Sequence, residues 1–195
     1  QQATLQFVLN YRLDPERASD PDRERIRIDG DELAAPARRY LMLNKPRGRV
    51  TSARDEHDRA TVYRCLDGAG LPWLAPVGRL DRASEGLLLM CNDPEWAARI
   101  TDPATGPDEA GESLRAKSAR MLRAGARHGW IEVALDEGRN RHIRRLLGAF
   151  NVAVLRLVRV AIGPLQLGTL PKGAWRELSA AEARTLAVPS PTKRD

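Results

Sequence analysis

A short loop between two apolar runs carries four charged side chains, Arg79, Asp81, Arg82 and Glu85. Glycines at both ends of the loop permit a tight turn. Catalytic groups are common on such loops because rigid strands on either side hold them in place. Arginines on both sides of Asp81 favour the ionised carboxylate even where it is partly desolvated. We therefore expect Asp81 to act as a nucleophile or a base.

Two interpretations of Asp81 are open from the local sequence alone. It is either a catalytic group or a structural loop acid paired with Arg79 or Arg82. For Glu85 we expect a structural role, as the partner of a neighbouring arginine or as a loop cap.

The positive charge of the chain is concentrated in one segment. The chain carries a net charge of +6, yet residues 138–176 contain no acid. A one-sided field of this kind suits a polyanion such as nucleic acid, although a solvated basic helix face would give the same pattern. The basic residues of the segment are Arg139, Arg141, Arg144, Arg145, Arg156, Arg159, Lys172 and Arg176.

Composition excludes several classes of protein. No apolar run approaches the ~20 residues of a membrane span, and the first residues lack a signal-peptide pattern. We therefore expect a cytoplasmic protein that does not associate with a membrane. The two cysteines lack metal-ligand spacing and read as reduced thiols. The three histidines are scattered, so we expect no metal site. For His142, in the basic segment, RNA contact and plain exposure are both open.

The periodicity of the chain predicts several strands joined by a few helices. Residues 40–50 form an apolar strand that ends in a basic turn, and IRIDGDEL has the Asp-Gly of a short hairpin. Residues 129–138 alternate as a half-exposed strand, 152–162 form a strong β run, and 61–66 form a short helix. Without repeated βαβ units, these elements favour an α+β fold with a mixed, mainly antiparallel sheet flanked by helices.

Helix signals complete the pattern. An Asn or Asp cap followed by Pro94 begins a helix, and a capping box at Ser179 and Glu182 begins the last one. A further helix in the basic segment has one apolar face, made of Ile143, Leu146, Leu147 and Phe150.

Three motifs follow one another along the chain: LNKPRG, then GRLDRASEGLLLMCND, then EGRNRHIRRLL with the following LRLVRVAIGPLQLGTLPKGAWREL. In this order they resemble the bacterial RsuA/RluB-type pseudouridine synthases, which modify ribosomal RNA. The resemblance covers roughly residues 40–188 and implies a pseudouridine synthase-like catalytic domain there. It implies isomerisation of a specific uridine in ribosomal RNA by a monomer that needs no cofactor. Residues 1–39 are then the remnant of an S4-type RNA-binding domain, and 189–195 a disordered tail.

The resemblance also implies roles for single residues. Asp81 attacks the uracil ring or the ribose anomeric carbon of a flipped-out nucleotide. Arg144 pairs with this carboxylate, and Arg79 is a second candidate for the same task or for contact with an RNA phosphate. Leu157 and Val158 form part of the apolar wall of the uracil pocket. The phosphate contacts that we expect are Lys45, Arg47, Arg82, Arg139, Arg141 and Arg145; for the lysine–proline–glycine turn at 45–48, plain solvation is about equally consistent with the sequence.

One feature departs from the family pattern. Family members carry a Lys-x-Tyr strand whose tyrosine packs on the target base, but here no tyrosine follows Tyr63. Either the chain has lost this strand between Asp108 and Glu109, or the printed sequence joins two parts of a longer chain. A genuine loss favours a second hypothesis, a catalytically weakened RNA-binding or ribosome-assembly factor that keeps the fold.

Overall fold

The computed structural model describes residues 27–28, 31–32, 37–53, 55, 57, 59–101, 114–125, 128–136 and 141–187. The chain divides into two compact units, Gln1–Ala37 and Arg38–Asp195. In the first unit, β1 (Arg27–Ile28) pairs antiparallel with β2 (Asp31–Glu32), which confirms the predicted hairpin. The rest of the predicted S4-type remnant before residue 37 and the tail over 189–195 lie outside the described residues.

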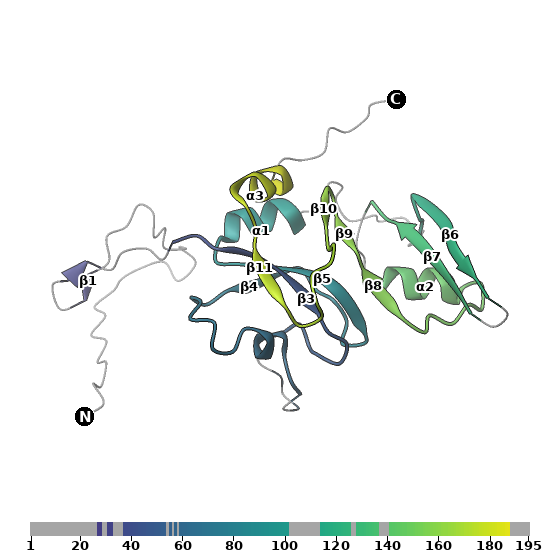
Figure 1. Ribbon diagram of the computed structural model, residues 1–195, viewed down its shortest axis with the longest axis horizontal. Helices are drawn as coiled ribbons and strands as arrows, with labels where there is room; N and C mark the ends of the chain where they lie inside the picture. The colour runs from purple at the N-terminus through teal and green to yellow at the C-terminus, as the bar shows by residue number, and fades with distance from the viewer. Residues whose placement is uncertain are drawn as a thin grey trace, which may run out of the picture. The chain divides into compact units, whose positions relative to one another are not determined.

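The second unit is built around one five-stranded sheet with the order β11-β3-β5-β4 and β8 beside β5 (Figure 1). All pairs are antiparallel except β5 with β8, which is parallel. This confirms the predicted α+β fold with a mixed, mainly antiparallel sheet. The strands are β3 (Tyr40–Lys45), β4 (Ala75–Val77), β5 (Ser84–Cys91), β8 (Leu157–Arg159) and β11 (Trp175–Glu177).

Strand β5 is the centre of the core, because every one of its residues is buried. Its alternating side chains feed two apolar clusters, one on each face of the sheet. Helices α1 (Pro94–Thr101) and α3 (Ala180–Ala187) cover one face, and the 3-10 helix η1 (Val62–Cys65) covers the other (Figure 1). Burial on both faces explains why β5 reads as a continuous apolar run rather than an alternating one.

After α1, the described part of the chain forms a hairpin and then several short strands. β7 (Gly129–Ala134) confirms a strand within 129–138, but its first four residues are all exposed, so the predicted half-exposed alternation is wrong there. It pairs antiparallel with β6 (Ser118–Ala124) in a hairpin. The predicted β run over 152–162 forms only β8 and the short β9 (Ala161–Ile162), which pairs with β10 (Leu165–Gln166).

Helix α2 (His142–Gly148) is shorter than its apolar pattern suggests. Gly148 is a poor helix former, and the helix ends there. Phe150 therefore lies beyond the helix and is 71% exposed, so it is not part of the predicted apolar face.

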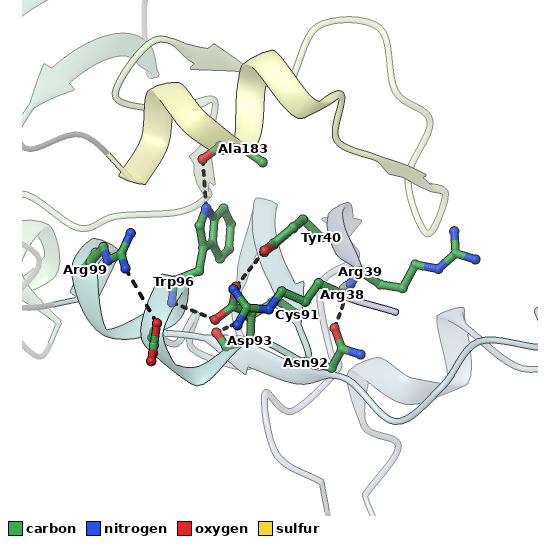
Figure 2. Close-up of polar contacts among 10 residues, drawn as sticks. Arg38, Arg39, Tyr40, Cys91, Asn92, Asp93, Trp96, Arg99 and Ala183 are labelled. Atoms are coloured by element: carbon green, nitrogen blue, oxygen red, sulfur yellow. Dashed lines mark hydrogen bonds and ion pairs between the residues drawn. The ribbon is translucent and has the colours of Figure 1, made fainter. Parts of the chain in front are cut away.

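A polar network at the end of β5 ties both covering helices to the sheet (Figure 2). Asp93 caps α1, since its Oδ1 accepts a hydrogen bond from the Trp96 backbone N–H at 3.0 Å, and its Oδ2 accepts one from the Tyr40 hydroxyl at 2.6 Å. The indole N–H of Trp96 donates to the carbonyl of Ala183 in α3 at 2.8 Å. The cap predicted before Pro94 is thus confirmed.

The predicted capping box begins α3. The Ser179 backbone N–H donates to Glu182 Oε2 at 2.8 Å, and the Glu182 backbone N–H donates to Ser179 Oγ at 3.2 Å. Arg176 of β11 also pairs with the Glu182 carboxylate at 2.6 Å, which joins this helix end to the sheet edge.

Candidate active site

Asp81 lies in the loop that joins β4 to β5. Gly78 has φ +69°, a left-handed conformation that glycine adopts without strain, and this lets the chain turn after β4. The Asp81 carbonyl accepts a hydrogen bond from the Ser84 backbone N–H at 2.9 Å, which closes the turn into β5. The Asp81 side chain is 37% exposed, so a substrate can reach its carboxylate. Arg79 and Arg82 are exposed beside it.

The segment 45–51, which begins with the last four residues of the LNKPRG motif, donates hydrogen bonds to backbone carbonyls of the Asp81 loop. Lys45 Nζ donates to the carbonyls of Asp81 at 3.1 Å and Ser84 at 2.8 Å. The Gly48 backbone N–H donates to the carbonyl of Arg82 at 2.8 Å. Thr51 Oγ1 donates to the carbonyl of Leu80 at 2.7 Å. The first motif therefore fixes the shape of the loop that carries the second.

Lys45 is fully buried, which differs from its predicted role as a phosphate contact. All three of its N–H donors go to carbonyls of its own chain, the third being that of Pro46 at 3.3 Å. Burial lowers the pKa of Lys45 to about 8, against the opposing effect of the Asp81 charge. In this structure the ammonium cannot meet RNA without leaving the loop. Arg47, in the same turn, is exposed.

Within the described part of the chain, the cation beside Asp81 is Arg141, with Nη1 at 3.9 Å from Asp81 Oδ2. Arg141 has φ 50° and ψ 30° directly before α2, a left-handed conformation that is uncommon for arginine and is often found at functional sites. Arg144, for which we predicted this pairing, instead donates from Nη1 to the carbonyl of Val154 at 3.0 Å. His142 is 3% exposed, so neither of the two roles left open for it fits this structure.

Glu85 is the partner of two cations that lie far away in sequence. Its buried carboxylate accepts hydrogen bonds from Arg156 Nε at 2.8 Å and Arg156 Nη2 at 3.1 Å. Lys172 Nζ lies 2.7 Å from Glu85 Oε2. Hydrogen bonds from Arg156 and Lys172 lower the pKa of Glu85 to about 2 although its burial opposes this. The predicted structural role is consistent with this geometry, but neither partner is a neighbour in the sequence.

The start of β5 packs against β8 at very short range. Gly86 has φ +101° and stands opposite Arg159, where a Cβ atom would lie 2.3 Å from the Arg159 carbonyl oxygen. Arg159 Nε donates to the carbonyl of Leu87 at 2.7 Å, and burial lowers the pKa of Arg159 to about 10. Leu157 and Val158, predicted to line the uracil pocket, are half-buried beside Ser84 and Glu85.

The other predicted residues are dispersed. Arg145 is exposed on α2. Arg139 lies outside the described residues, and so does the junction of Asp108 and Glu109, where the family pattern would place the Lys-x-Tyr strand. Where the structure describes the chain, no three His, Cys, Asp or Glu side chains gather as a metal site would require. None of the helices in those same ranges is long and apolar enough to cross a membrane.

Fold and site together describe an α+β domain that carries a partly exposed carboxylate among exposed arginines, an arrangement that suits a protein acting on a polyanion. A family model described as RNA pseudouridylate synthase matches residues 39–109. An uncharacterized RNA pseudouridine synthase of Aquifex aeolicus (strain VF5) is 33% identical over 193 residues, which cover 86% of this chain and 77% of the relative. The chain belongs to the RNA pseudouridine synthases, isomerases that act on RNA.

Two further relatives agree with this assignment. Ribosomal large subunit pseudouridine synthase B of Escherichia coli (strain K12) is 36% identical over 195 residues, which cover 83% of this chain and 66% of that protein. A solved structure described as a pseudouridylate synthase superimposes with a TM-score of 0.61 at 29% identity and covers 76% of this chain and 74% of that one. The resemblance to the RsuA/RluB type and the expected pseudouridine synthase-like fold are thereby confirmed.

Proposed function

We propose that this enzyme isomerises a uridine of ribosomal RNA and that Asp81 is its nucleophile. The observation that carries the proposal is the geometry of the loop. Hydrogen bonds from the segment 45–51 fix four of its backbone carbonyls, and the loop so held exposes the Asp81 carboxylate to solvent. Ribosomal RNA is proposed as substrate because the similar protein of Escherichia coli is named for the large ribosomal subunit.

The reaction needs no net change in atoms. The carboxylate of Asp81 adds to the uracil ring or to the ribose anomeric carbon, and the bond between N1 and that carbon breaks. The base rotates, C5 of uracil forms the new bond to the ribose carbon, and the bond to the Asp81 carboxylate breaks so that the carboxylate is regenerated. C5 loses its proton while N1 gains one. A base stacked in RNA exposes neither reacting atom, so the nucleotide must leave the stack first.

Cations around the loop suit this task. Among the described residues, Arg141 lies beside the Asp81 carboxylate, with Nη1 3.9 Å from Oδ2, and is in place to orient it. Arg47, Arg79 and Arg82 are exposed on the same loop and its supporting turn, in place to meet RNA phosphates. Arg144 has an indirect role: its hydrogen bond to the Val154 carbonyl fixes the part of the chain that follows α2.

Replacement of Asp81 by Asn tests the proposal. Transcribed large- and small-subunit ribosomal RNA labelled with tritium at C5 of uridine reports the reaction, because the label is lost when the new bond forms. We expect release from one of the two RNAs by the wild type and at least a ~1000-fold lower rate for D81N, with RNA affinity retained within about threefold. Asp67→Asn, an exposed acid of another loop, is the matched control. Undiminished release by D81N would refute the assignment of Asp81.

The same experiment separates the second hypothesis. A catalytically weakened RNA-binding or ribosome-assembly factor would bind the RNA but release no tritium even as the wild type. The absent Lys-x-Tyr strand is the observation that favours this outcome, since its tyrosine is the group expected to hold the base.

A further inference from the structure

Two cations surround one buried carboxylate at the start of β5. The Glu85 side chain is 3% exposed, whereas those of Arg156 and Lys172 are 41% and 58% exposed. The cluster therefore places its negative charge inside the protein and its positive charges toward solvent. With a pKa of about 2, Glu85 is ionised at neutral pH, so the three groups together carry one excess positive charge.

The second cation exceeds what burial of Glu85 requires. Arg156 alone contacts both carboxylate oxygens, a two-pronged geometry that satisfies and neutralises a buried carboxylate. In the cluster of Glu85, Arg156 and Lys172 there is no second acid, so the charge of Lys172 is not compensated there. An uncompensated, solvent-facing charge held on a fixed partner is suited to an external anion.

Both cations are also held in place before any ligand arrives. The Arg156 guanidinium lies over the Trp130 ring, 5.7 Å from its centroid. The loop that carries Lys172 is fixed to β3, because Asn44 Nδ2 donates to the Leu170 carbonyl at 2.7 Å and the Gly173 N–H donates to the Asn44 carbonyl at 2.8 Å. A preformed pair loses little conformational freedom on binding.

The cluster is close to the loop of Asp81. The turn from Asp81 to Ser84 is closed by a hydrogen bond, and Glu85 follows directly, so its backbone lies within roughly 10 Å of that of Asp81. We propose that Arg156 and Lys172 bind a backbone phosphate of the RNA beside the nucleotide that Asp81 attacks, with Glu85 as the buried group that positions both cations. This inference rests on the proposed function and adds a binding site to it.

Lys172→Ala is the direct test, because this side chain is exposed and its loss leaves the pair of Arg156 and Glu85 intact. Affinity for the ribosomal RNA substrate is measured over a series of salt concentrations, without turnover. We expect the slope of log affinity against log salt to fall by about 0.7–0.9 and the affinity near 150 mM salt to fall roughly 3- to 10-fold. Arg184→Gln, an exposed arginine of α3, should change neither quantity.

The outcomes separate this inference from the proposed function. If the wild type binds RNA and K172A binds with the same affinity and salt slope, Lys172 is only a structural partner of Glu85 and the inference is wrong. Thermal unfolding of each variant shows that it is folded, and Lys172→Gln repeats the test with a longer side chain. Failure of the wild type to form pseudouridine would refute the proposed function, while the binding comparison would still stand.

Discussion

At the scale of single residues, Lys45 acts on Asp81 through the backbone. Its ammonium group holds the carbonyls of Asp81 and Ser84, the two ends of the turn that presents the carboxylate. A charged donor at this place is needed because a neutral amine has only two N–H groups for the three carbonyls. Lys45 is therefore a positioning residue, although its motif also suits phosphate binding.

Lys45→Met should lower kcat by roughly 10- to 100-fold with little change in RNA affinity, since the lost group supports the catalytic loop and does not reach solvent. Tritium release and RNA binding measure the two quantities separately, at a temperature where the variant is folded. Arg47→Gln is the matched comparison, because this exposed neighbour should show the reverse pattern, weaker binding with kcat retained. A K45M enzyme with full kcat and weakened, less salt-dependent binding would restore the predicted phosphate contact.

Sequence reasoning locates Asp81 because four charges between two apolar runs are conspicuous in any chain. It does not find the role of Lys45, since the partners are backbone carbonyls, which have no signature in the sequence. Nor does it find the partners of Glu85, because Arg156 and Lys172 follow it by 71 and 87 positions and meet it only through the sheet.

At the scale of elements, the contact between β5 and β8 brings the basic segment to the site. Gly86 permits it, as its Cα faces the Arg159 backbone with no room for a side chain. The pairing also places Leu157 and Val158 beside the start of β5. A glycine in the middle of a buried strand thus has a packing reason as well as a conformational one.

Gly86→Ala should reduce the free energy of unfolding by roughly 2–4 kcal/mol, because the new Cβ would overlap the Arg159 carbonyl and φ +101° is strained for alanine. Urea denaturation measures the change. Gly168→Ala is the control, since Gly168 has φ +59° and no atom within 4 Å of a Cβ, and only the backbone cost of ~1 kcal/mol remains. Equal losses for the two variants would show that close packing on β8 is unimportant.

Most elements follow from local patterns, and the exceptions have long-range causes. The hairpin at β1 and β2, both covering helices and the central strands are recognisable from turns, caps and apolar runs. The parallel pairing of β8 with β5 depends on residues more than seventy positions apart, which no local pattern encodes. The same holds for Arg141, whose approach to Asp81 depends on the left-handed turn before α2.

At the scale of the whole catalytic unit, Asp93 connects the sheet to α1, and Trp96 of α1 is in turn hydrogen-bonded to α3 (Figure 2). The Asp93 carboxylate accepts hydrogen bonds from the Tyr40 hydroxyl of β3 and from the Trp96 backbone N–H of α1. Arg38 Nη1 lies 3.3 Å from Asp93 Oδ2. Burial raises the pKa of Asp93, but these hydrogen bonds and the Arg38 charge outweigh it, so the net pKa lies below the usual value. Burial and the same carboxylate raise the pKa of Tyr40 to about 12.

Asp93→Asn should reduce the free energy of unfolding by about 1–3 kcal/mol at neutral pH, because a buried charged acceptor is lost. The folded pKa lies below the unfolded value of ~3.9, so the stability from this carboxylate is fully present above pH ~4 and is lost as pH falls through the folded pKa. The difference between wild type and D93N should therefore shrink below pH ~4 in urea denaturation series. Glu95→Gln, in the same helical turn but exposed, should cost no more than ~0.5 kcal/mol. A pH-independent difference would mean that Asp93 acts through shape alone and that its charge does not hold α1 to the sheet.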